Sequence, residues 1–220
     1  MSTTETHASP LPKVVILGAT GPTGRHLVAQ AVSRGHDVTV LARSPEKAAE
    51  LKGAKLVVGD ARDEKALRQA LKGRDAVISA LGTPASPFRE VTLLSTATQA
   101  LVKAMTAENV SRLVAITGVG AGDSRGHGGA LFDKAIFPIL LRKVYADKNR
   151  QEDIIRKSGL DWTIIRPTIL TNKPGTQFVR ALTDLQGFHG GSIAREDVAR
   201  FVLDQVVSDE WLHKSPLITA

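Results

Sequence analysis

Short apolar runs alternate with longer amphipathic stretches along most of the chain. The first run, Val14–Leu17, is unbroken and rich in β-branched residues, which is typical of a buried parallel strand. Five further runs of similar length follow, and the helical patterns between them often end at a glycine. The pattern predicts strands at residues 13–17, 37–41, 55–58, 75–79, 112–117 and 162–166. It predicts helices from about residue 22 to 34 and at 44–52, 63–71, 90–108, 142–158 and 195–207.

This alternation of strands and helices predicts an α/β fold. Two successive βαβαβ halves give a Rossmann-type doubly wound parallel sheet with strand order 3-2-1-4-5-6 and helices on both faces. We expect one Rossmann domain over residues 13–220, with a small C-terminal cap beside the binding site, and a flexible tail over residues 1–12. In this order a ligand lies across the carboxyl ends of the strands at 13–17 and 75–79.

The alternation is interrupted after the strand at 112–117. Six glycines fall within residues 118–129, and an apolar segment follows at 130–141. Because glycine-rich loops are often mobile or shaped around a ligand, these two segments could together form a lid over a substrate. Residues 167–191 show no regular pattern, and residues 216–219 are a candidate edge strand.

A glycine-rich turn joins the first strand to the first helix. Its glycines lie three residues apart, and Pro22 suits the first turn of a helix. Glycine has no Cβ to hold a phosphate away, and a helix N-terminus presents unpaired N–H groups to an anion. The turn therefore predicts a site for the pyrophosphate of a dinucleotide; the alternative is a tight turn that binds nothing. The predicted contacts are Gly18, Thr20, Gly21, Pro22, Thr23 and Gly24.

The end of the second strand distinguishes two dinucleotides. An NAD site has a carboxylate there for the ribose 2′-hydroxyl, whereas an NADP site has cations for the 2′-phosphate. Asp37 lies at the wrong end of the strand, and Arg43 occupies the phosphate position with Ser44 and Lys47 close behind it. We therefore predict that the cofactor is NADP(H), preferred over NAD(H). The alternative is that Arg43 is an exposed loop residue.

Further cofactor contacts are expected after the third, fourth and sixth strands. Asp60 could accept a hydrogen bond from the adenine amino group, or it could cap the following helix. The other predicted contacts are small residues, or lie beside the nicotinamide at the end of the sixth strand. They are Ala61, Ala80, Leu81, Gly82, Pro167, Thr168 and Ile169.

Five segments resemble, in order, the motifs of a known family. They are V-V-I-L-G-A-T-G-P-T-G-R, V-T-V-L-A-R, V-V-G-D, D-A-V-I-S-A-L-G-T and S-G-L-D-W-T-I-I-R-P. Together they look like the NAD(P)H-binding atypical short-chain dehydrogenase/reductases, a group that includes NmrA-like proteins and flavin reductases of the biliverdin reductase B type. The resemblance spans about residues 13–207. It implies NADPH bound along the strand ends and hydride transfer to a planar acceptor.

Three polar residues resemble the catalytic Ser/Thr, Tyr and Lys of short-chain dehydrogenases. They are Thr117, Tyr145 and Lys148. In that family the tyrosine is the acid, and the lysine lowers its pKa and holds the ribose. Here Tyr145 and Lys148 are three residues apart rather than four, and Val144 occupies the family's tyrosine position. This departure favours Lys148 as a cofactor contact, and the alternative for Tyr145 is a packed aromatic residue.

Three functions are compatible with these residues. The first is an NADPH-dependent oxidoreductase that passes hydride to a planar acceptor such as a flavin or quinone. The second is a non-catalytic NADP(H) sensor of the NmrA-like type, and the third is an epimerase or dehydratase that recycles its cofactor. Flavin reductases of the family carry a serine and a histidine where this chain has Gly118 and Thr168, which counts against flavin or tetrapyrrole activity.

Composition excludes several other classes. The 220 residues include no cysteine, so disulfides and thiolate sites are excluded, and the six histidines show no metal-ligand spacing. The formal charge of +7 comes from scattered basic residues, and only 4% of residues are aromatic, so no nucleic-acid platform is predicted. The charge fits a solvated surface or attraction of an anionic ligand.

The remaining expectations concern location, assembly and one misleading motif. No apolar run has membrane-spanning length, and the N-terminus lacks signal-peptide features, so we expect a cytoplasmic monomer or homodimer with no membrane partner. Residues 122–126 match the G-x-S-x-G motif of serine hydrolases. No strand leads directly into that serine and glycines follow it, so a hydrolase is not predicted.

Overall fold

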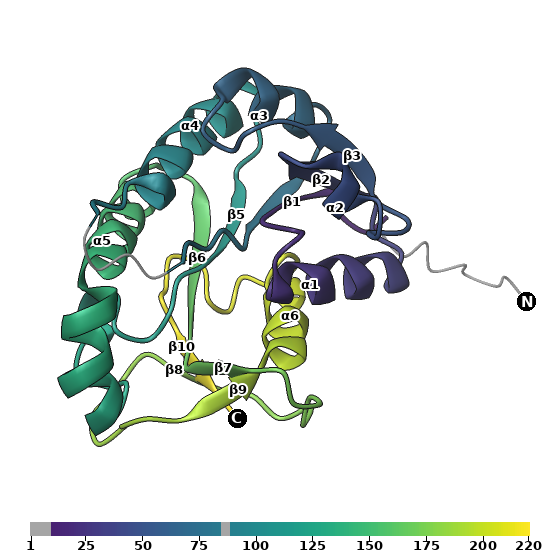
Figure 1. Ribbon diagram of the computed structural model, residues 1–220. Helices are drawn as coiled ribbons and strands as arrows, with labels where there is room; N and C mark the ends of the chain where they lie inside the picture. Colours follow the sequence, from purple (N-terminus) through teal and green to yellow (C-terminus); the bar gives the residue numbers. More distant parts are fainter. Residues whose placement is uncertain (1–9, 85–88) are drawn as a thin grey trace, which may run out of the picture.

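The computed structural model describes residues 10–84 and 89–220 (Figure 1). Most of the predicted N-terminal tail and residues 85–87 of the predicted loop after the fourth strand lie outside the described residues.

A central sheet of eight strands forms the middle layer, in the order β3-β2-β1-β4-β5-β6-β10-β8 (Figure 1). The predicted order 3-2-1-4-5-6 is confirmed and is extended by two strands at one edge. All neighbouring pairs are parallel except β10 with β8. The strands are β1 (Val14–Leu17), β2 (Val38–Ala42), β3 (Lys55–Val58), β4 (Ala76–Ser79), β5 (Arg112–Ile116), β6 (Asp161–Pro167), β8 (Arg180–Leu182) and β10 (Leu217–Thr219).

Helices cover both faces of the sheet because alternate strand residues face opposite ways. Val14 and Ile16 pack with α1 (Pro22–Ser33) and α6 (Arg195–Asp204) in one apolar cluster. Val15 and Leu17 pack on the other face with α3 (Glu64–Leu71), α4 (Leu93–Ala107) and α5 (Arg142–Arg156). All four residues of β1 are fully buried, as expected for a strand covered on both faces.

The predicted apolar segment is helical. Residues 132–141 form the π-helix η2 (Phe132–Leu141), which includes Pro138 and leads directly into α5. Phe132 and Phe137 point inward and pack against Tyr145, while Leu131 and Ile139 are exposed. The glycine-rich segment before η2 contains one short 3-10 turn, η1 (Gly122–Ser124).

The C-terminal third of the chain corrects two expectations. Residues 167–191 were expected to be irregular, but they contain β7 (Ile169–Thr171) and β8, and β7 pairs with β9 (Ser192–Ala194) in a separate small sheet. The strand predicted at 216–219 is β10, which lies between β6 and β8 and is not an edge strand. Strands of three residues are too short to show an alternating pattern, which explains why β7 and β8 were missed.

Buried hydrogen bonds position α5, which carries Lys148 toward the strand ends. The buried carboxylate of Asp147 accepts hydrogen bonds from the backbone N–H of Leu94 at 2.8 Å and from the Ser95 hydroxyl at 2.5 Å, so α5 caps the start of α4. The second helix, α2 (Pro45–Ala48), is one turn long and ends before the predicted residue 52.

Candidate functional site

A cavity of about 540 Å³ lies at the carboxyl ends of the parallel strands, where β1 and β4 are neighbours in the sheet. It is lined by residues from the β1–α1 turn, the ends of β2 to β5, and α5. The predicted site residues among them are Gly18, Thr20, Gly21, Pro22, Thr23, Gly24, Arg43, Asp60, Ala61, Ala80, Leu81, Gly82, Thr117 and Lys148. Residues distant in sequence are therefore brought together at the predicted edge of the sheet.

At the three glycine positions of the β1–α1 turn, an added Cβ would meet different surroundings. Gly18 has a φ of +77°, and a Cβ there would lie 2.4 Å from the Ala80 carbonyl oxygen. A Cβ on Gly24 would lie 2.1 Å from the carbonyl oxygen of Gly18. Gly21 has an ordinary φ of −75°, and its nearest obstacle would be the Gly18 carbonyl oxygen at 3.2 Å. Gly18 and Gly24 are thus required by packing, whereas Gly21 leaves space on the cavity side.

Among residues 10–84 and 89–220, no side chain caps the N-terminus of α1. Its N-cap is Gly21, and no acidic residue lies in its first turn. The first N–H groups of a helix have no acceptor within the helix, and the helix dipole makes this end positive. The cavity therefore has an anion-attracting end at Gly21–Thr23.

Arg43 lies on the rim of the same cavity, directly after β2. Its side chain is exposed, and within the described residues no carboxylate forms an ion pair with it. Asp60 is close enough that Arg43 helps to lower its pKa, although the main cause is the Arg62 guanidinium, which forms two hydrogen bonds with the carboxylate. The pKa of Asp60 is about 2, so this carboxylate is charged at neutral pH.

Asp60 does not cap the following helix. The N-cap of α3 is Asp63, whose side chain accepts a hydrogen bond from the Lys65 N–H at 2.9 Å. Asp60 instead accepts from the Arg62 backbone at 2.8 Å and lines the cavity. Of the two interpretations of Asp60, the helix cap is therefore wrong.

Lys148 reaches the cavity from α5. Its ammonium group donates a hydrogen bond to the backbone carbonyl of Thr117 at 2.5 Å, which ties α5 to the end of β5. Burial lowers the pKa of Lys148 to about 8, and the charge of Glu152 partly opposes this effect. The Thr117 hydroxyl donates to the Glu152 carboxylate at 2.7 Å, so it is already engaged within the protein.

Tyr145 is not among the residues that line the cavity. Its ring packs between Phe132 and Phe137 and lies 5.0 Å from the Lys148 ammonium group. Burial raises the pKa of the Tyr145 hydroxyl above its ordinary value, which makes it a weaker proton donor. The structure thus brings Thr117 and Lys148 to the cavity and places Tyr145 in an aromatic cluster.

Five other predicted contacts also do not line the cavity. Ser44 caps α2, and its hydroxyl donates to Glu46 at 2.6 Å. Thr168 is buried, and its hydroxyl donates to Thr219 on β10 at 3.2 Å. Thr168 is therefore engaged within the sheet and is not turned toward the cavity. The other three are Lys47, Pro167 and Ile169.

The sequence reasoning missed several residues that line the cavity. Leu170 and Arg195 come from β7 and the first turn of α6, and Leu93 from the start of α4. Their contribution depends on how the C-terminal third folds back over the sheet, and no local motif signals it. The remaining missed residues flank predicted ones and are Leu41, Ala42, Gly59, Thr83, Pro84 and Ile116.

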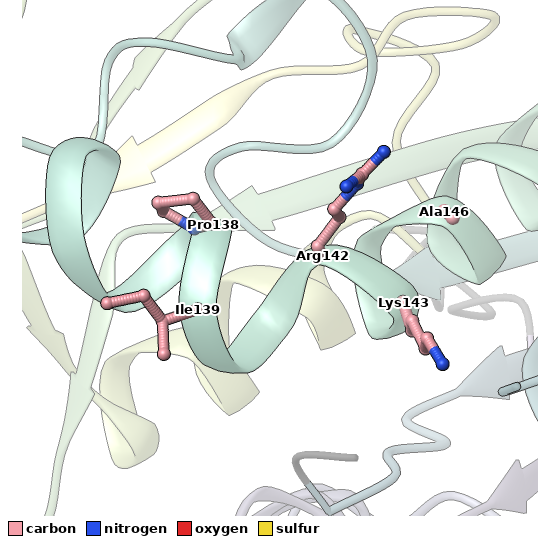
Figure 2. Close-up of a pocket in the computed structure, with 5 residues that line it drawn as sticks. All are labelled: Pro138, Ile139, Arg142, Lys143 and Ala146. Atoms are coloured by element: carbon pink, nitrogen blue, oxygen red, sulfur yellow. The ribbon is translucent and has the colours of Figure 1, made fainter. Parts of the chain in front are cut away.

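A second hollow of about 480 Å³ lies outside this site, where η2 meets α5 (Figure 2). It is lined by Pro138, Ile139, Arg142, Lys143 and Ala146 and shares no residue with the first cavity. Ala146 and Lys148 are two residues apart on α5, so they face different directions.

Ser124, the serine of the G-x-S-x-G match, is fully buried. Its hydroxyl donates to the Ala121 carbonyl at 2.6 Å and accepts from the Gly120 N–H at 3.0 Å. It lies in η1 and not at the tip of a strand-to-helix turn, so it is not a nucleophile of the hydrolase type.

Across residues 10–84 and 89–220, no three histidine, aspartate or glutamate side chains gather in a metal-binding arrangement. Over the same residues, no helix combines the length and apolar character needed to cross a membrane.

The strand order, the uncapped α1 turn and the cavity across β1 and β4 define a Rossmann-type dinucleotide-binding protein. A sequence model of the NAD(P)H-binding family matches residues 18–209, and the chain belongs to this family. The resemblance stated from the sequence motifs is thereby confirmed at the level of NAD(P)H binding. The family includes both oxidoreductase-like and epimerase-like members.

Two curated relatives illustrate this range. The chain is 32% identical over 197 residues to YhfK of Bacillus subtilis, described as an uncharacterized sugar epimerase, covering 87% of this chain and 86% of YhfK. It is 28% identical over 161 residues to a (4-alkanoyl-5-oxo-2,5-dihydrofuran-3-yl)methyl phosphate reductase of Streptomyces griseus. That match covers 72% of this chain and 49% of the reductase.

Solved structures share the fold over nearly the whole chain. ChuY, an anaerobilin reductase from Escherichia coli O157:H7, superimposes with a TM-score of 0.80 at 21% identity, covering 94% of this chain and 96% of ChuY. A short-chain dehydrogenase/reductase from Veillonella parvula in complex with NADP superimposes with a TM-score of 0.75 at 20% identity, covering 96% and 95%. At these identities the similarity establishes the fold and not the reaction.

Proposed function

We propose that this protein is an NADPH-dependent oxidoreductase that passes hydride to a planar small-molecule acceptor such as a quinone or flavin. The observation that carries the proposal is the single cavity that extends from the uncapped N-terminus of α1, past Arg43, to Lys148. Its polar ends match the charge of a phosphorylated dinucleotide, and its volume of about 540 Å³ falls within the usual range of ligand sites.

The residues present fit the dinucleotide. Gly21 leaves room beside the free N–H groups of α1, where a pyrophosphate is favoured by hydrogen bonds and by the helix dipole. Arg43 can hold a ribose 2′-phosphate through two parallel hydrogen bonds, and Asp60 can accept from the adenine amino group. The absence of a carboxylate at the end of β2 favours NADP(H) over NAD(H).

Lys148 and Thr117 belong to the other end of the cavity. When bound, the cofactor supplies the hydride, and the protein must orient it and exclude water. Lys148 is anchored on the Thr117 carbonyl and would contact the ribose beside the nicotinamide. Leu170 and Ile116 add apolar surface near the same end, which suits a flat acceptor. For a quinone or flavin, the proton can come from solvent.

One of the comparisons supports a reductase. ChuY, named as an anaerobilin reductase, has the same fold over 94% of this chain. The Gly118 and Thr168 positions still differ from the serine and histidine expected of flavin reductases, so a quinone is favoured over a flavin or tetrapyrrole.

A second candidate function is a non-catalytic NADP(H) sensor. The position of Tyr145 favours it, because a buried tyrosine with a raised pKa outside the cavity leaves the site without the family's usual acid. A cofactor-recycling epimerase or dehydratase is a third candidate, supported by the name of the Bacillus subtilis relative.

An acceptor screen separates the three candidates. The purified protein is mixed with NADPH and a panel of quinones, flavin mononucleotide and biliverdin, and the loss of nicotinamide absorbance is followed. A reductase consumes NADPH when one acceptor is present and loses this activity in Gly21→Val. A sensor binds NADPH and NADP⁺ with similar affinity and turns over none of the panel. A recycling enzyme binds the cofactor but consumes none during product formation.

A further inference from the structure

A buried ion pair lies directly behind the nicotinamide end of the cavity and has no part in the proposed chemistry so far. Glu152 on α5 is fully buried, and Arg166 at the end of β6 is 1% exposed. The Arg166 guanidinium donates two hydrogen bonds to Glu152, from Nε at 3.0 Å and from Nη2 at 2.6 Å. Buried charges are costly unless paired, so the question is what this pair holds in place.

The pair connects three elements that meet at the cavity. Glu152 also accepts a hydrogen bond from the Thr117 hydroxyl at the end of β5 and pairs with Arg156 one turn along α5 at 3.2 Å. On its other side, Arg166 pairs with Asp123 in η1 of the glycine-rich segment. Gly122 is needed here, because a Cβ on it would lie 2.2 Å from the Arg166 guanidinium.

Lys148 depends on the same arrangement. It lies one turn before Glu152 on α5, and its ammonium group donates to the carbonyl of Thr117, whose hydroxyl donates to Glu152. Thr117 is thus held by both residues, through different oxygen atoms. A change at Glu152 would alter both the position of Thr117 and the electrostatic field at Lys148.

We propose that Glu152 is a positioning residue of the cofactor site, which fixes Thr117 and the charge of Lys148 and, through Arg166, ties the glycine-rich segment to this end of the cavity. The proposal rests on the proposed function in assigning Lys148 to the cofactor. Glu152 does not line the cavity, so it acts through these neighbours and not by contact with cofactor or substrate.

The electrostatic part of this role has a definite sign. Burial lowers the pKa of Lys148 to about 8, and the negative charge of Glu152 raises it. Replacing Glu152 by glutamine removes that charge and leaves the arginines uncompensated, so the pKa of Lys148 falls further. Lys148 then loses its positive charge at a lower pH. The groups that face Lys148 or share its cavity are Tyr145, Glu152, Arg166, Asp123 beyond Arg166, Arg43, Asp60 and Arg195.

The experiment measures the pKa of Lys148 directly in the cofactor-free protein, by NMR titration of its side-chain ammonium group. The variants are Glu152→Gln and Glu152→Asp, with Glu108→Gln as the matched control. Glu108 also forms an ion pair from a helix end, with Arg68 at 2.8 Å, but lies outside the cavity. Thermal unfolding of each variant establishes that it is folded.

We expect the Lys148 pKa to fall in Glu152→Gln, to stay near the wild-type value in Glu152→Asp, and to be unchanged in Glu108→Gln. The affinity for NADPH, titrated at several pH values, should follow the Lys148 pKa. The affinity of the wild-type protein declines as the pH rises through about 8, where Lys148 loses its charge. The decline in Glu152→Gln begins at lower pH. If only the charged lysine binds, a fall of one unit from about 8 weakens the affinity at neutral pH about twofold, and each further unit weakens it by up to about tenfold.

A folded Glu152→Gln protein with a wild-type Lys148 pKa would overturn the proposal, as would a Glu152→Asp variant that shifts as much as the glutamine. If Glu152→Gln does not fold, Thr117→Ser and Thr117→Val take its place: the serine keeps the hydroxyl link to Glu152 and the valine breaks it, while both keep the ion pair. Weaker NADPH binding in Thr117→Val than in Thr117→Ser is expected, and equal binding by the two folded variants would contradict the positioning role. If the wild-type protein binds no NADPH while the pKa shifts are observed, the proposed function fails; the coupling of Glu152 to Lys148 then stands, but not its role in a cofactor site.

Discussion

The charged side chains of Arg43 and Lys148 lie at opposite ends of the cavity, and their environments differ. Arg43 is exposed on the rim, where its charge is available to a ligand without cost of burial. Lys148 is buried against the Thr117 carbonyl, and burial lowers its pKa to about 8. Arg43 is therefore suited to hold a permanently charged phosphate, whereas the charge of Lys148 varies near physiological pH.

Replacing Arg43 by alanine should weaken NADPH binding and leave NADH binding nearly unchanged. A hydrogen bond to a charged group is worth about 1.5–3 kcal/mol, which corresponds to roughly ten- to hundredfold in affinity. Calorimetric titration of both cofactors measures the change. Lys47→Ala is the control, because Lys47 is one turn away and does not line the cavity. Equal losses for NADPH and NADH would contradict the assignment of Arg43 to the 2′-phosphate.

Replacing Tyr145 by phenylalanine should preserve most of the NADPH oxidation rate. The hydroxyl is removed, but the ring keeps its contacts with Phe132 and Phe137, and the cavity lining is unchanged. Steady-state turnover with the best acceptor tests this expectation. A loss of a hundredfold or more, in a variant as stable as the wild type, would show that Tyr145 is the acid despite its raised pKa.

In the β1–α1 turn, one glycine is needed for packing and another for cofactor binding. Gly24→Ala should destabilise the fold, because its Cβ would lie 2.1 Å from the Gly18 carbonyl oxygen; such overpacking costs about 1–3 kcal/mol or more. Gly21→Val should lower the melting temperature less than Gly24→Ala, because its Cβ would lie 3.2 Å from the Gly18 carbonyl oxygen, and should abolish cofactor binding. Differential scanning calorimetry and NADPH titration of both variants separate the two effects. A Gly21→Val protein that still binds NADPH would contradict the site.

The elements that could be predicted from the sequence are those with a strong local signal. Val14–Leu17 is apolar without interruption, and Gly35 and Gly73 follow helices and have positive φ. The π-helix η2 was not predicted, since periodicity alone does not distinguish a helix from a strand in a short apolar run such as residues 130–141. β8 is three residues long, and the strand it pairs with is β10 from the far end of the chain.

The same distinction applies to the site. The residues of the β1–α1 turn, Arg43 and Lys148 reach the cavity because each follows or faces a strand end that the motifs identify. Leu170 and Arg195 reach it only through the fold of the C-terminal third. Arg166 falls within the S-G-L-D-W-T-I-I-R-P motif, but Glu152 lies outside the motifs, and the pairing of the two depends on α5 packing beside β6.

At the scale of the whole molecule, the sheet order decides where chemistry can occur. β1 and β4 are neighbours, so the chain leaves them toward opposite faces and opens a crevice at their carboxyl ends. The segments after β6 add β7, β9 and α6 beside that crevice and leave no separate substrate domain within the described residues (Figure 1). A small acceptor bound next to the cofactor is the arrangement that this architecture favours.

The central claim is that this cavity is an NADPH site, and one measurement tests it most directly. The purified wild-type protein is titrated with NADPH and with NADH under identical conditions, and the two dissociation constants are compared. We predict that NADPH binds at least about tenfold more tightly than NADH, which is the difference expected for one charge-assisted contact to the 2′-phosphate. Equal affinity, tighter binding of NADH, or no binding of either cofactor would contradict it.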